Sequence, residues 1–206
     1  MLTVVALSDT HGYHGHLSVP EGDILILAGD LTRRGRLEEV AELNSFLAGL
    51  PHRHKLVVAG NHDWCFQESP VEARALLTAA IYLQDEGVVI EGVNFYGSPW
   101  QPWFMDWAFN LPRGPELAQR WAQIPEDTDI LITHGPPLGF GDRVDSGEHV
   151  GCEDLLRRVQ QVRPKLHLFG HIHEARGIWT EGGTTFANVA TDFGRRGAQV
   201  LFYPPV

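Results

Sequence analysis

The sequence has few cysteines and no spacing between them that thiol chemistry would need. Cys65 and Cys152 are the two cysteines among 206 residues, and they form no Cys-x-x-Cys pair. A disulfide framework or a thiolate zinc site requires more cysteines at closer spacing. We therefore expect two reduced thiols and a cytoplasmic location.

Long apolar segments and basic runs are lacking as well. No hydrophobic run approaches the roughly 20 residues of a membrane-spanning helix, and the chain opens into an apolar segment without a signal-peptide pattern. We expect no membrane partner. The 26 acidic residues outnumber the 16 basic ones, for a formal net charge of −10. This balance argues against long nucleic acid as a partner, because such binding relies on basic side chains that neutralise phosphates.

The composition that is present is that of one globular domain. Hydrophobic residues make up 43% of the chain and charged residues 20%, which is enough apolar material for a sizeable core. Two independent domains would each be small. We expect a single domain over residues 1–206; nothing in the sequence indicates the oligomeric state.

Apolar runs alternate with segments of helical periodicity, the pattern of an α/β protein. Pro51 and Pro164 stop two of the helical segments. The expected strands are 2–7, 23–28, 55–59, a hairpin over 88–97, 129–133, 165–169, 177–180, 184–189 and 198–203. The expected helices are 37–50, 70–83, 116–124 and 150–162.

Five of the expected strands end in histidine, aspartate or asparagine, usually beside glycine. Open α/β sheets place their functional sites at the carboxyl ends of strands. The terminal groups are Asp9 and His11, Asp30, Asn61 with His62 and Asp63, His134, and His171 with His173.

These residue types suit metal binding. Asp9 and His11 are two positions apart, as are His171 and His173, so on an extended backbone each pair points one way. The same alternation lets Asn61 face a metal while His62 faces a substrate, and Asp63 is expected to hold the His62 imidazole in one tautomer.

The number of these side chains predicts two cations. Oxygen and nitrogen ligands without a thiolate suit manganese, iron, zinc or nickel. Seven ligands exceed what one catalytic ion takes from a protein, so two ions that share one carboxylate account for them. The seven are Asp9, His11, Asp30, Asn61, His134, His171 and His173. His167, inside a strand, is expected to be a buried histidine with its polar atoms satisfied.

The segment 98–110 contains three of the six tryptophans. Two interpretations remain open: a loop anchored by aromatic burial, or a wall that stacks on a flat group such as a nucleobase. Trp100 from this segment and Arg33 are candidate substrate contacts, together with Asn61 and His62.

Taken in order, the motifs Asp-x-His, Gly-Asp, Gly-Asn-His-Asp, His and Gly-His-x-His resemble the calcineurin-like metallophosphoesterase superfamily. The segments 97–102, 106–114 and 133–138 are similar to its metallophosphoesterase-domain-containing (brain 239-like) branch. One known member of that branch has glycine where this chain has His171, so a complete second metal site is expected here. The resemblance implies a four-layer α/β sandwich of two mixed β-sheets flanked by α-helices.

The resemblance also implies roles. Asp9, His11 and His173 would hold the first metal, Asn61, His134 and His171 the second, and Asp30 would bridge them. Two divalent ions, manganese being favoured, would supply a bridging hydroxide as nucleophile, and His62 would act at the leaving group.

The expected activity is that of a phosphodiesterase on small phosphodiesters, with cyclic nucleotides as one class. Within enzymes, a phosphomonoesterase or protein phosphatase is the alternative. A non-catalytic metal-binding scaffold is a third reading.

Overall fold

The computed structural model describes residues 1–204 and contains two main β-sheets. The first sheet has five strands in the order β13-β1-β2-β3-β4, in which β13 is antiparallel to β1 and the others are parallel. Its strands are β1 (Leu2–Leu7), β2 (Ile24–Ala28), β3 (His54–Val58), β4 (Ile81–Tyr82) and β13 (Gln199–Tyr203).

The second sheet has six strands in the order β11-β12-β10-β9-β6-β5, with antiparallel strands at both edges. Its strands are β5 (Glu86–Ile90), β6 (Val93–Ser98), β9 (Ile130–Thr133), β10 (Leu166–Phe169), β11 (Gly177–Glu181) and β12 (Thr184–Asn188). The predicted hairpin is present: Glu91 and Gly92 both have positive φ, as a two-residue hairpin turn requires.

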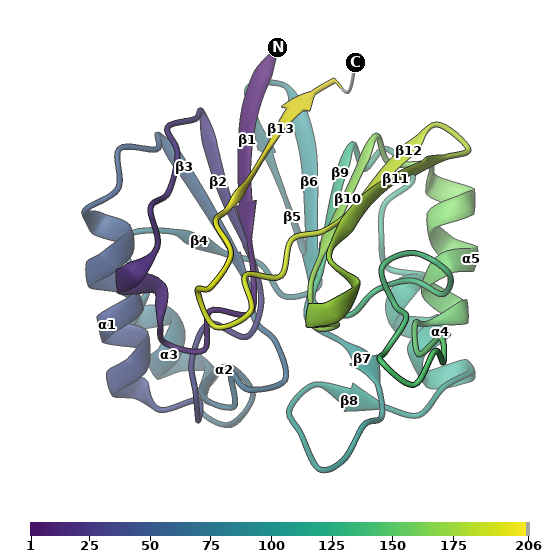
Figure 1. Ribbon diagram of the computed structural model, residues 1–206, viewed down its shortest axis with the longest axis horizontal. Helices are drawn as coiled ribbons and strands as arrows, with labels where there is room; N and C mark the ends of the chain where they lie inside the picture. Colours follow the sequence, from purple (N-terminus) through teal and green to yellow (C-terminus); the bar gives the residue numbers. More distant parts are fainter. Residues whose placement is uncertain (205–206) are drawn as a thin grey trace.

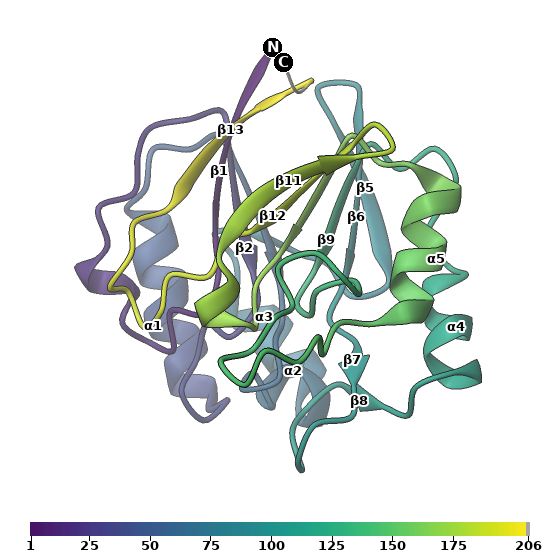
Figure 2. The same cartoon turned by 45° about the vertical axis from the view of Figure 1, so that its right-hand side comes forward.

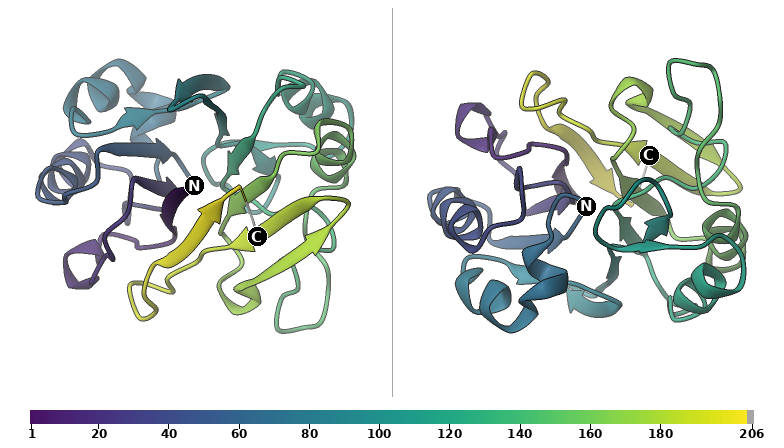
Figure 3. Two further views of the ribbon diagram at one scale, coloured as in Figure 1. Left: turned by 90° about the horizontal axis from the view of Figure 1, so that it is seen from above. Right: turned by 90° about the horizontal axis from the view of Figure 1, so that it is seen from below.

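The two sheets face each other, and helices cover both outer faces (Figures 1 and 3). The outer face of the five-stranded sheet is covered by α1 (Leu37–Ala48), α2 (Cys65–Glu68) and α3 (Pro70–Leu76), and that of the six-stranded sheet by α4 (Pro115–Trp121) and α5 (Glu153–Val162). The predicted four-layer α/β sandwich is confirmed.

The strands are apolar without interruption because both of their faces are buried. In β1, Val4 and Ala6 pack in the core between the sheets, whereas Val5 and Leu7 pack against the helices. Facing residues from the other sheet, such as Ile132 of β9, complete the central core.

The helix predicted over 70–83 is wrong in its second half. α3 ends at Leu76, and Ile81 and Tyr82 form the edge strand β4, which pairs with β3. Asn44 of α1 explains the break, because its side-chain oxygen accepts a hydrogen bond from the Ala79 backbone N–H at 2.8 Å. The short helix α2 was not predicted.

β1 begins and β13 ends at one end of the molecule, and the carboxyl ends of β1, β2 and β3 point to the other (Figure 1). A small parallel pair, β7 (Gln101–Pro102) with β8 (Asn110–Leu111), lies at that second end. Two 3₁₀ turns complete the elements, η1 (His14–His16) and η2 (His173–Ala175). Among the described residues, no helix is long and apolar enough to cross a membrane.

Candidate metal centre

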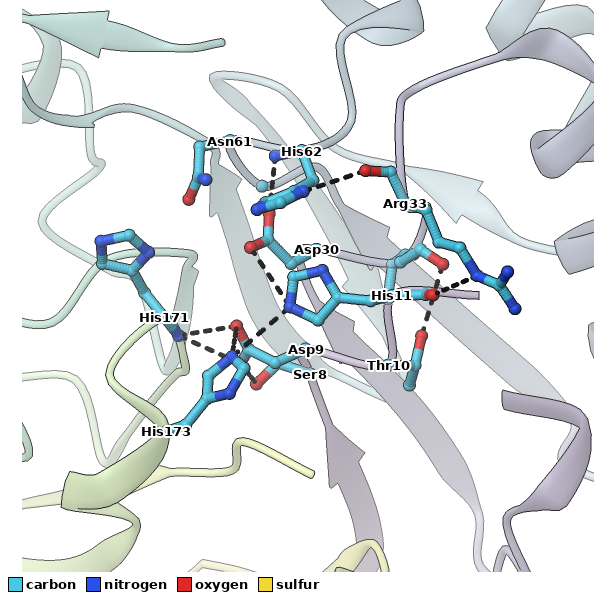
Figure 4. Close-up of polar contacts among 12 residues, drawn as sticks. Ser8, Asp9, Thr10, His11, Asp30, Arg33, Asn61, His62, His171 and His173 are labelled. Carbon is cyan, nitrogen blue, oxygen red and sulfur yellow. Dashed lines mark hydrogen bonds and ion pairs between the residues drawn. The ribbon is translucent and has the colours of Figure 1, made fainter. Parts of the chain in front are cut away.

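The seven predicted ligands meet where strands of both sheets end, and Figure 4 labels six of them, all except His134. Asp9 and His11 follow β1, Asp30 follows β2 and Asn61 follows β3, all in the five-stranded sheet. His134 follows β9, and His171 and His173 follow β10, in the six-stranded sheet. The site therefore lies where the two sheets come together.

The backbone of these turns differs from the extended form we expected. Four ligands have left-handed φ: Asp9 at 55°, His11 at 46°, Asp30 at 55° and His171 at 69°. Residues other than glycine adopt this region at a cost of about 1–3 kcal/mol, and such strain concentrates at functional sites. The ligands converge through tight turns and not through alternation along a strand.

Two glycines in these motifs are required by close approach. A Cβ at Gly60 would overlap the Asp30 backbone nitrogen and side chain. A Cβ at Gly170 would overlap the side chains of Ser8 and Asp9. The absence of a side chain lets neighbouring turns come together at the ligands.

The first ligand cluster contains Asp9, His11 and His173, whose ligand atoms all lie within 4.8 Å of one another. His173 Nε2 is 3.3 Å from Asp9 Oδ1 and 3.4 Å from His11 Nε2. Asp9 is fully buried, so its carboxylate has little water around it. One carboxylate and two imidazoles at this spacing fit a divalent cation.

The second cluster contains Asp30, His134 and His171, again with ligand atoms within 4.8 Å. His134 Nε2 lies 2.9 Å from Asn61 Oδ1, which brings that amide to the same point. Its other ring nitrogen, Nδ1, donates to the Ala28 carbonyl at 2.9 Å and so leaves Nε2 directed at the site.

Asp30 lies between the clusters. Its Oδ1 is 3.4 Å from His134 Nε2, and its Oδ2 is 3.8 Å from His11 Nε2. The two oxygens of one carboxylate thus face different ligand sets. This is the placement that a bridging carboxylate needs, and the donor set fits two divalent cations.

The electrostatics of the centre follow from burial and close charges. Burial alone would lower the pKa of His134, but the carboxylates of Asp30 and Asp9 outweigh it and raise that pKa to about 9. Burial lowers the pKa of His171 to about 4, and His134 adds to this shift. Although burial opposes it, His134 holds the pKa of Asp30 below its ordinary value.

His62 lies beside these ligands. One of its ring nitrogens lies within 4.8 Å of a ring nitrogen of His11 and of a carboxylate oxygen of Asp30. Its backbone N–H donates to Asp30 Oδ1 at 2.8 Å. Its Nδ1 is 3.0 Å from the Arg33 carbonyl, which can only accept, so Nδ1 carries a proton. Figure 4 shows this contact.

The expected role of Asp63 is wrong. Its carboxylate accepts hydrogen bonds from the backbone N–H groups of Gly60, Leu31 and Thr32, and from the Thr32 hydroxyl. The Asp63 side chain is fully buried beneath the turn. We expected its carboxylate to accept from the His62 ring, but the Arg33 carbonyl is the group found there. Burial and the nearby Asp30 charge raise the pKa of Asp63 to about 6. Asp63 shapes the turn and does not contact the imidazole.

The candidate substrate contacts Arg33 and Trp100 also differ from expectation. The Arg33 side chain donates from Nε to the His11 carbonyl at 3.1 Å, covers the Tyr13 ring, and points away from the metal ligands in Figure 4. The Trp100 Nε1–H donates to Asp85 Oδ2 at 2.7 Å, and Arg120 stacks on its ring. Both side chains are occupied by structural contacts.

The segment 98–110 is partly buried and partly lines a pocket. Trp100 anchors it, while Trp103 and Phe104 are 65% and 52% exposed. These two residues line a pocket of about 360 Å³ that also includes His171 and Arg113. The pocket wall beside His171 is therefore formed by Trp103 and Phe104, and not by Trp100, the residue expected to contact substrate.

Four residues near the site were not predicted. Ser8 donates to the Asp9 carboxylate, Trp107 stacks on His62, and Asp192 and Phe193 contact ligands of the first cluster. Ser8 precedes a motif and could have been suspected. Trp107 lies in the tryptophan-rich segment 98–110, although its contact with His62 was not expected. Asp192 and Phe193 have no local sequence signal.

Comparison with known proteins agrees with this geometry. Metallophosphoesterase domain-containing protein 1 of Homo sapiens is 46% identical over 211 residues, covering 90% of this chain. The chain spans 65% of the length of that relative. A Synechococcus protein named "Probable cyclic nucleotide phosphodiesterase" is 29% identical over 182 residues, covering 84% of this chain and 66% of that protein.

The fold is found among solved structures as well. The protein TT1561 of Thermus thermophilus superposes with a TM-score of 0.61 at 15% identity, over 97% of each chain. The family model for calcineurin-like phosphoesterases matches residues 2–175, which include all seven predicted ligands. The chain therefore belongs to the calcineurin-like phosphoesterase family, and the resemblance to its metallophosphoesterase-domain-containing branch is confirmed.

Proposed function

We propose that the protein is a phosphodiesterase that hydrolyses small phosphodiesters with two divalent cations, Mn²⁺ being favoured. The observation that carries this proposal is the position of Asp30, whose two oxygens face separate ligand clusters with His62 beside both. When bound, a pair of cations activates water and neutralises charge on a transferring phosphoryl group.

Two sets of residues would bind the two cations. Asp9, His11 and His173 form the first set, Asn61, His134 and His171 the second, and Asp30 is common to both. Asn61 contributes a neutral oxygen, so the second set gains a ligand without gaining negative charge. This keeps the centre attractive to an anionic phosphate.

His62 is suited to protonate the leaving oxygen. Because Nδ1 donates to the Arg33 carbonyl, Nε2 is the nitrogen left to carry or release a second proton. Protonated at Nε2, it would donate to the departing alkoxide as the phosphorus–oxygen bond breaks. General acid catalysis of this kind contributes roughly 10²–10⁴ in rate.

The adjacent pocket supports a small substrate. Its volume of about 360 Å³ is at the lower end for small-molecule sites, and Trp103 and Phe104 offer aromatic faces next to His171. A flat group attached to the phosphate would lie against these rings. Cyclic nucleotides have such a group, and the name of the Synechococcus relative points to the same class.

Two variants test the catalytic assignment. His62→Ala should retain two bound Mn²⁺ ions and lose about 10²–10⁴ in turnover of diesters with poor, alkyl-type leaving groups. Asp30→Ala should lose both ions together with activity on every diester. Metal content is measured on the purified protein, and hydrolysis with a 3′,5′-cyclic nucleotide and with bis(p-nitrophenyl) phosphate. Full turnover of the cyclic nucleotide by the His62 variant would remove this residue from the mechanism.

The type of ester is tested by comparing the hydrolysis of bis(p-nitrophenyl) phosphate with that of p-nitrophenyl phosphate at the same Mn²⁺ concentration. Preference for the monoester would favour the phosphomonoesterase alternative. Stoichiometric Mn²⁺ binding without hydrolysis of either ester, or of 3′,5′-cyclic nucleotides, would favour a scaffold.

A further inference from the structure

The loop that joins β12 to β13 crosses from the six-stranded sheet to the five-stranded sheet, the yellow connection in Figures 1 and 2. Its residues Thr191, Asp192 and Phe193 are here called the crossing turn. They lie beyond residue 175, where the match to the family model ends. Nothing in the family motifs assigns a role to this turn.

The crossing turn is fixed against the strand end that carries Asp9. The Thr191 hydroxyl donates to the Ser8 carbonyl at 2.7 Å, and the Phe193 N–H donates to the Asp9 carbonyl at 3.0 Å. The Thr191 N–H also donates to the Ser8 carbonyl, at 3.0 Å. These bonds hold the turn in place without using the Asp192 carboxylate.

Asp192 and Phe193 contact the two imidazoles of the first cluster. His173 Nδ1 is 3.3 Å from Asp192 Oδ1, and because a carboxylate only accepts, Nδ1 must donate. With Nδ1 protonated, Nε2 is the ring nitrogen that can give up its proton to bind a cation, and Nε2 is the atom directed at Asp9 and His11. The Phe193 ring stacks on His11 with centroids 4.5 Å apart and meets His173 edge-on at 5.1 Å.

The backbone of the crossing turn is strained where these contacts are made. Asp192 and Phe193 have successive left-handed φ values of 52° and 58°. Aspartate tolerates this region, whereas a phenylalanine there costs free energy that the surrounding structure must offset. The strain turns the carboxylate and the ring toward the ligands at the same time.

We propose that the crossing turn is a positioning element of the first metal site, in which Asp192 orients His173 as a ligand and Phe193 fixes the plane of His11. This role rests on the metal centre of the proposed function. Carboxylates that accept from a metal-bound imidazole typically contribute 10–100-fold in metal affinity. Asp192 is therefore a residue that acts through His173 and does not itself touch substrate.

The experiment uses Mn²⁺ binding, measured by calorimetry, in a His171→Ala background that isolates the first site. Asp192→Gly removes the carboxylate and keeps a residue that accepts φ of 52°. Asp192→Asn keeps an oxygen acceptor without the charge. Asp127→Asn, an exposed carboxylate preceding β9 at the far end of the sheet, is the control.

We expect Asp192→Gly to weaken Mn²⁺ binding about 10–100-fold, Asp192→Asn to fall between it and the parent, and Asp127→Asn to match the parent. In a His173→Gln background the Asp192 substitutions should have no further effect, because no imidazole remains to be oriented. Parent-like affinity for Asp192→Gly, or an equal loss with and without His173, would overturn the proposal.

Hydrolysis is measured separately on the single variants. If Mn²⁺ binding responds as expected while no phosphodiester is cleaved by the wild-type protein, the proposed function fails and the positioning role stands. If diesters are cleaved and Asp192→Gly binds Mn²⁺ with parent-like affinity, the positioning role fails and the proposed function stands.

Discussion

The Trp107 indole stacks on the His62 imidazole, with ring centroids 4.2 Å apart and planes inclined by 29°. The loop that carries Trp107 is fixed by the two residues that follow it. The Ala108 N–H donates to the Asn61 carbonyl at 3.1 Å, and the Phe109 N–H donates to Gln67 Oε1 at 2.6 Å. The imidazole therefore lies between this indole and His11, which meets it edge-on at 4.5 Å. Trp107 restricts the rotation of a proposed general acid.

Trp107→Ala should lower kcat by about tenfold for diesters with poor, alkyl-type leaving groups, since a misplaced acid delivers its proton less well. Diesters of p-nitrophenol need little protonation and should be affected much less. Trp107→Phe should restore most of the loss, and KM should change little in either variant. Equal losses for both kinds of leaving group would indicate a general disturbance of the site.

Gly170→Ala should weaken the first metal site. The added Cβ overlaps the Ser8 and Asp9 side chains, so the Asp9 carboxylate must shift. We expect weaker Mn²⁺ binding and a loss of about 1–3 kcal/mol in the free energy of unfolding, the usual cost of overpacking. Gly15→Ala is the matched control, because its Cβ would meet nothing within 4 Å. Similar metal affinity in the two variants would contradict the steric reading.

His167→Leu should make the protein less sensitive to acid. His167 is fully buried as expected, and its Nε2 is 2.9 Å from the Thr133 hydroxyl. The expectation that all its polar atoms are satisfied is wrong, because its Nδ1 has no hydrogen-bond partner within residues 1–204. Burial lowers its pKa to about 3, so the folded state resists protonation that the unfolded state accepts below about pH 6.5. Its contribution to stability is present above that pH and is lost as the pH falls toward 3.

Between about pH 6.5 and pH 5 this loss amounts to about 2 kcal/mol for the wild-type protein, and the leucine variant should lack it. Urea unfolding in the presence of a chelator, at pH 7.5, 6 and 5, measures the difference between the two proteins. Parallel pH dependence would mean that His167 is not the group responsible.

Metal binding should release protons near neutral pH. His134 is protonated there, because Asp30 and Asp9 outweigh the effect of burial and raise its pKa to about 9. Its Nε2–H donates to Asn61 Oδ1 at 2.9 Å, and a cation ligated at Nε2 must replace this proton. Apparent Mn²⁺ affinity should therefore rise with pH up to about 9.

Calorimetry in buffers of different ionisation enthalpy measures the number of protons released. His134→Gln should release fewer protons than the wild-type protein at pH 7. Affinity that is independent of pH between 6.5 and 8.5 would contradict this protonation state.

The strand ends were predictable from the sequence because the same residues that stop an apolar run supply the metal ligands. Strands such as residues 2–7 are buried on both faces. The polar residues that follow such a strand therefore mark its carboxyl end, where the chain leaves the sheet. The order of the motifs resembles one family, and this resemblance predicted the four-layer sandwich. The assignment of a single domain over 1–206 and the roles of the individual ligands stay predictions.

What the sequence did not reveal depends on contacts between distant segments. Asp63 was expected at His62, but only the fold shows that the Arg33 carbonyl is there instead. The segment 77–83 has helical periodicity, yet Asn44 and the edge of β3 bind its backbone. Asp192 lies in a loop without a motif, and its distance from His173 is a property of the three-dimensional structure.

The placement of the ligands on two sheets has a mechanical consequence. Each set takes side chains from both halves of the sandwich: Asp9 and His11 with His173, and Asn61 with His134 and His171. A bound ion would link the two halves at the end of the sandwich where these turns meet. Removing the ions should loosen this end first, so amide exchange in the 9–12 and 171–174 turns should accelerate before exchange in the strands.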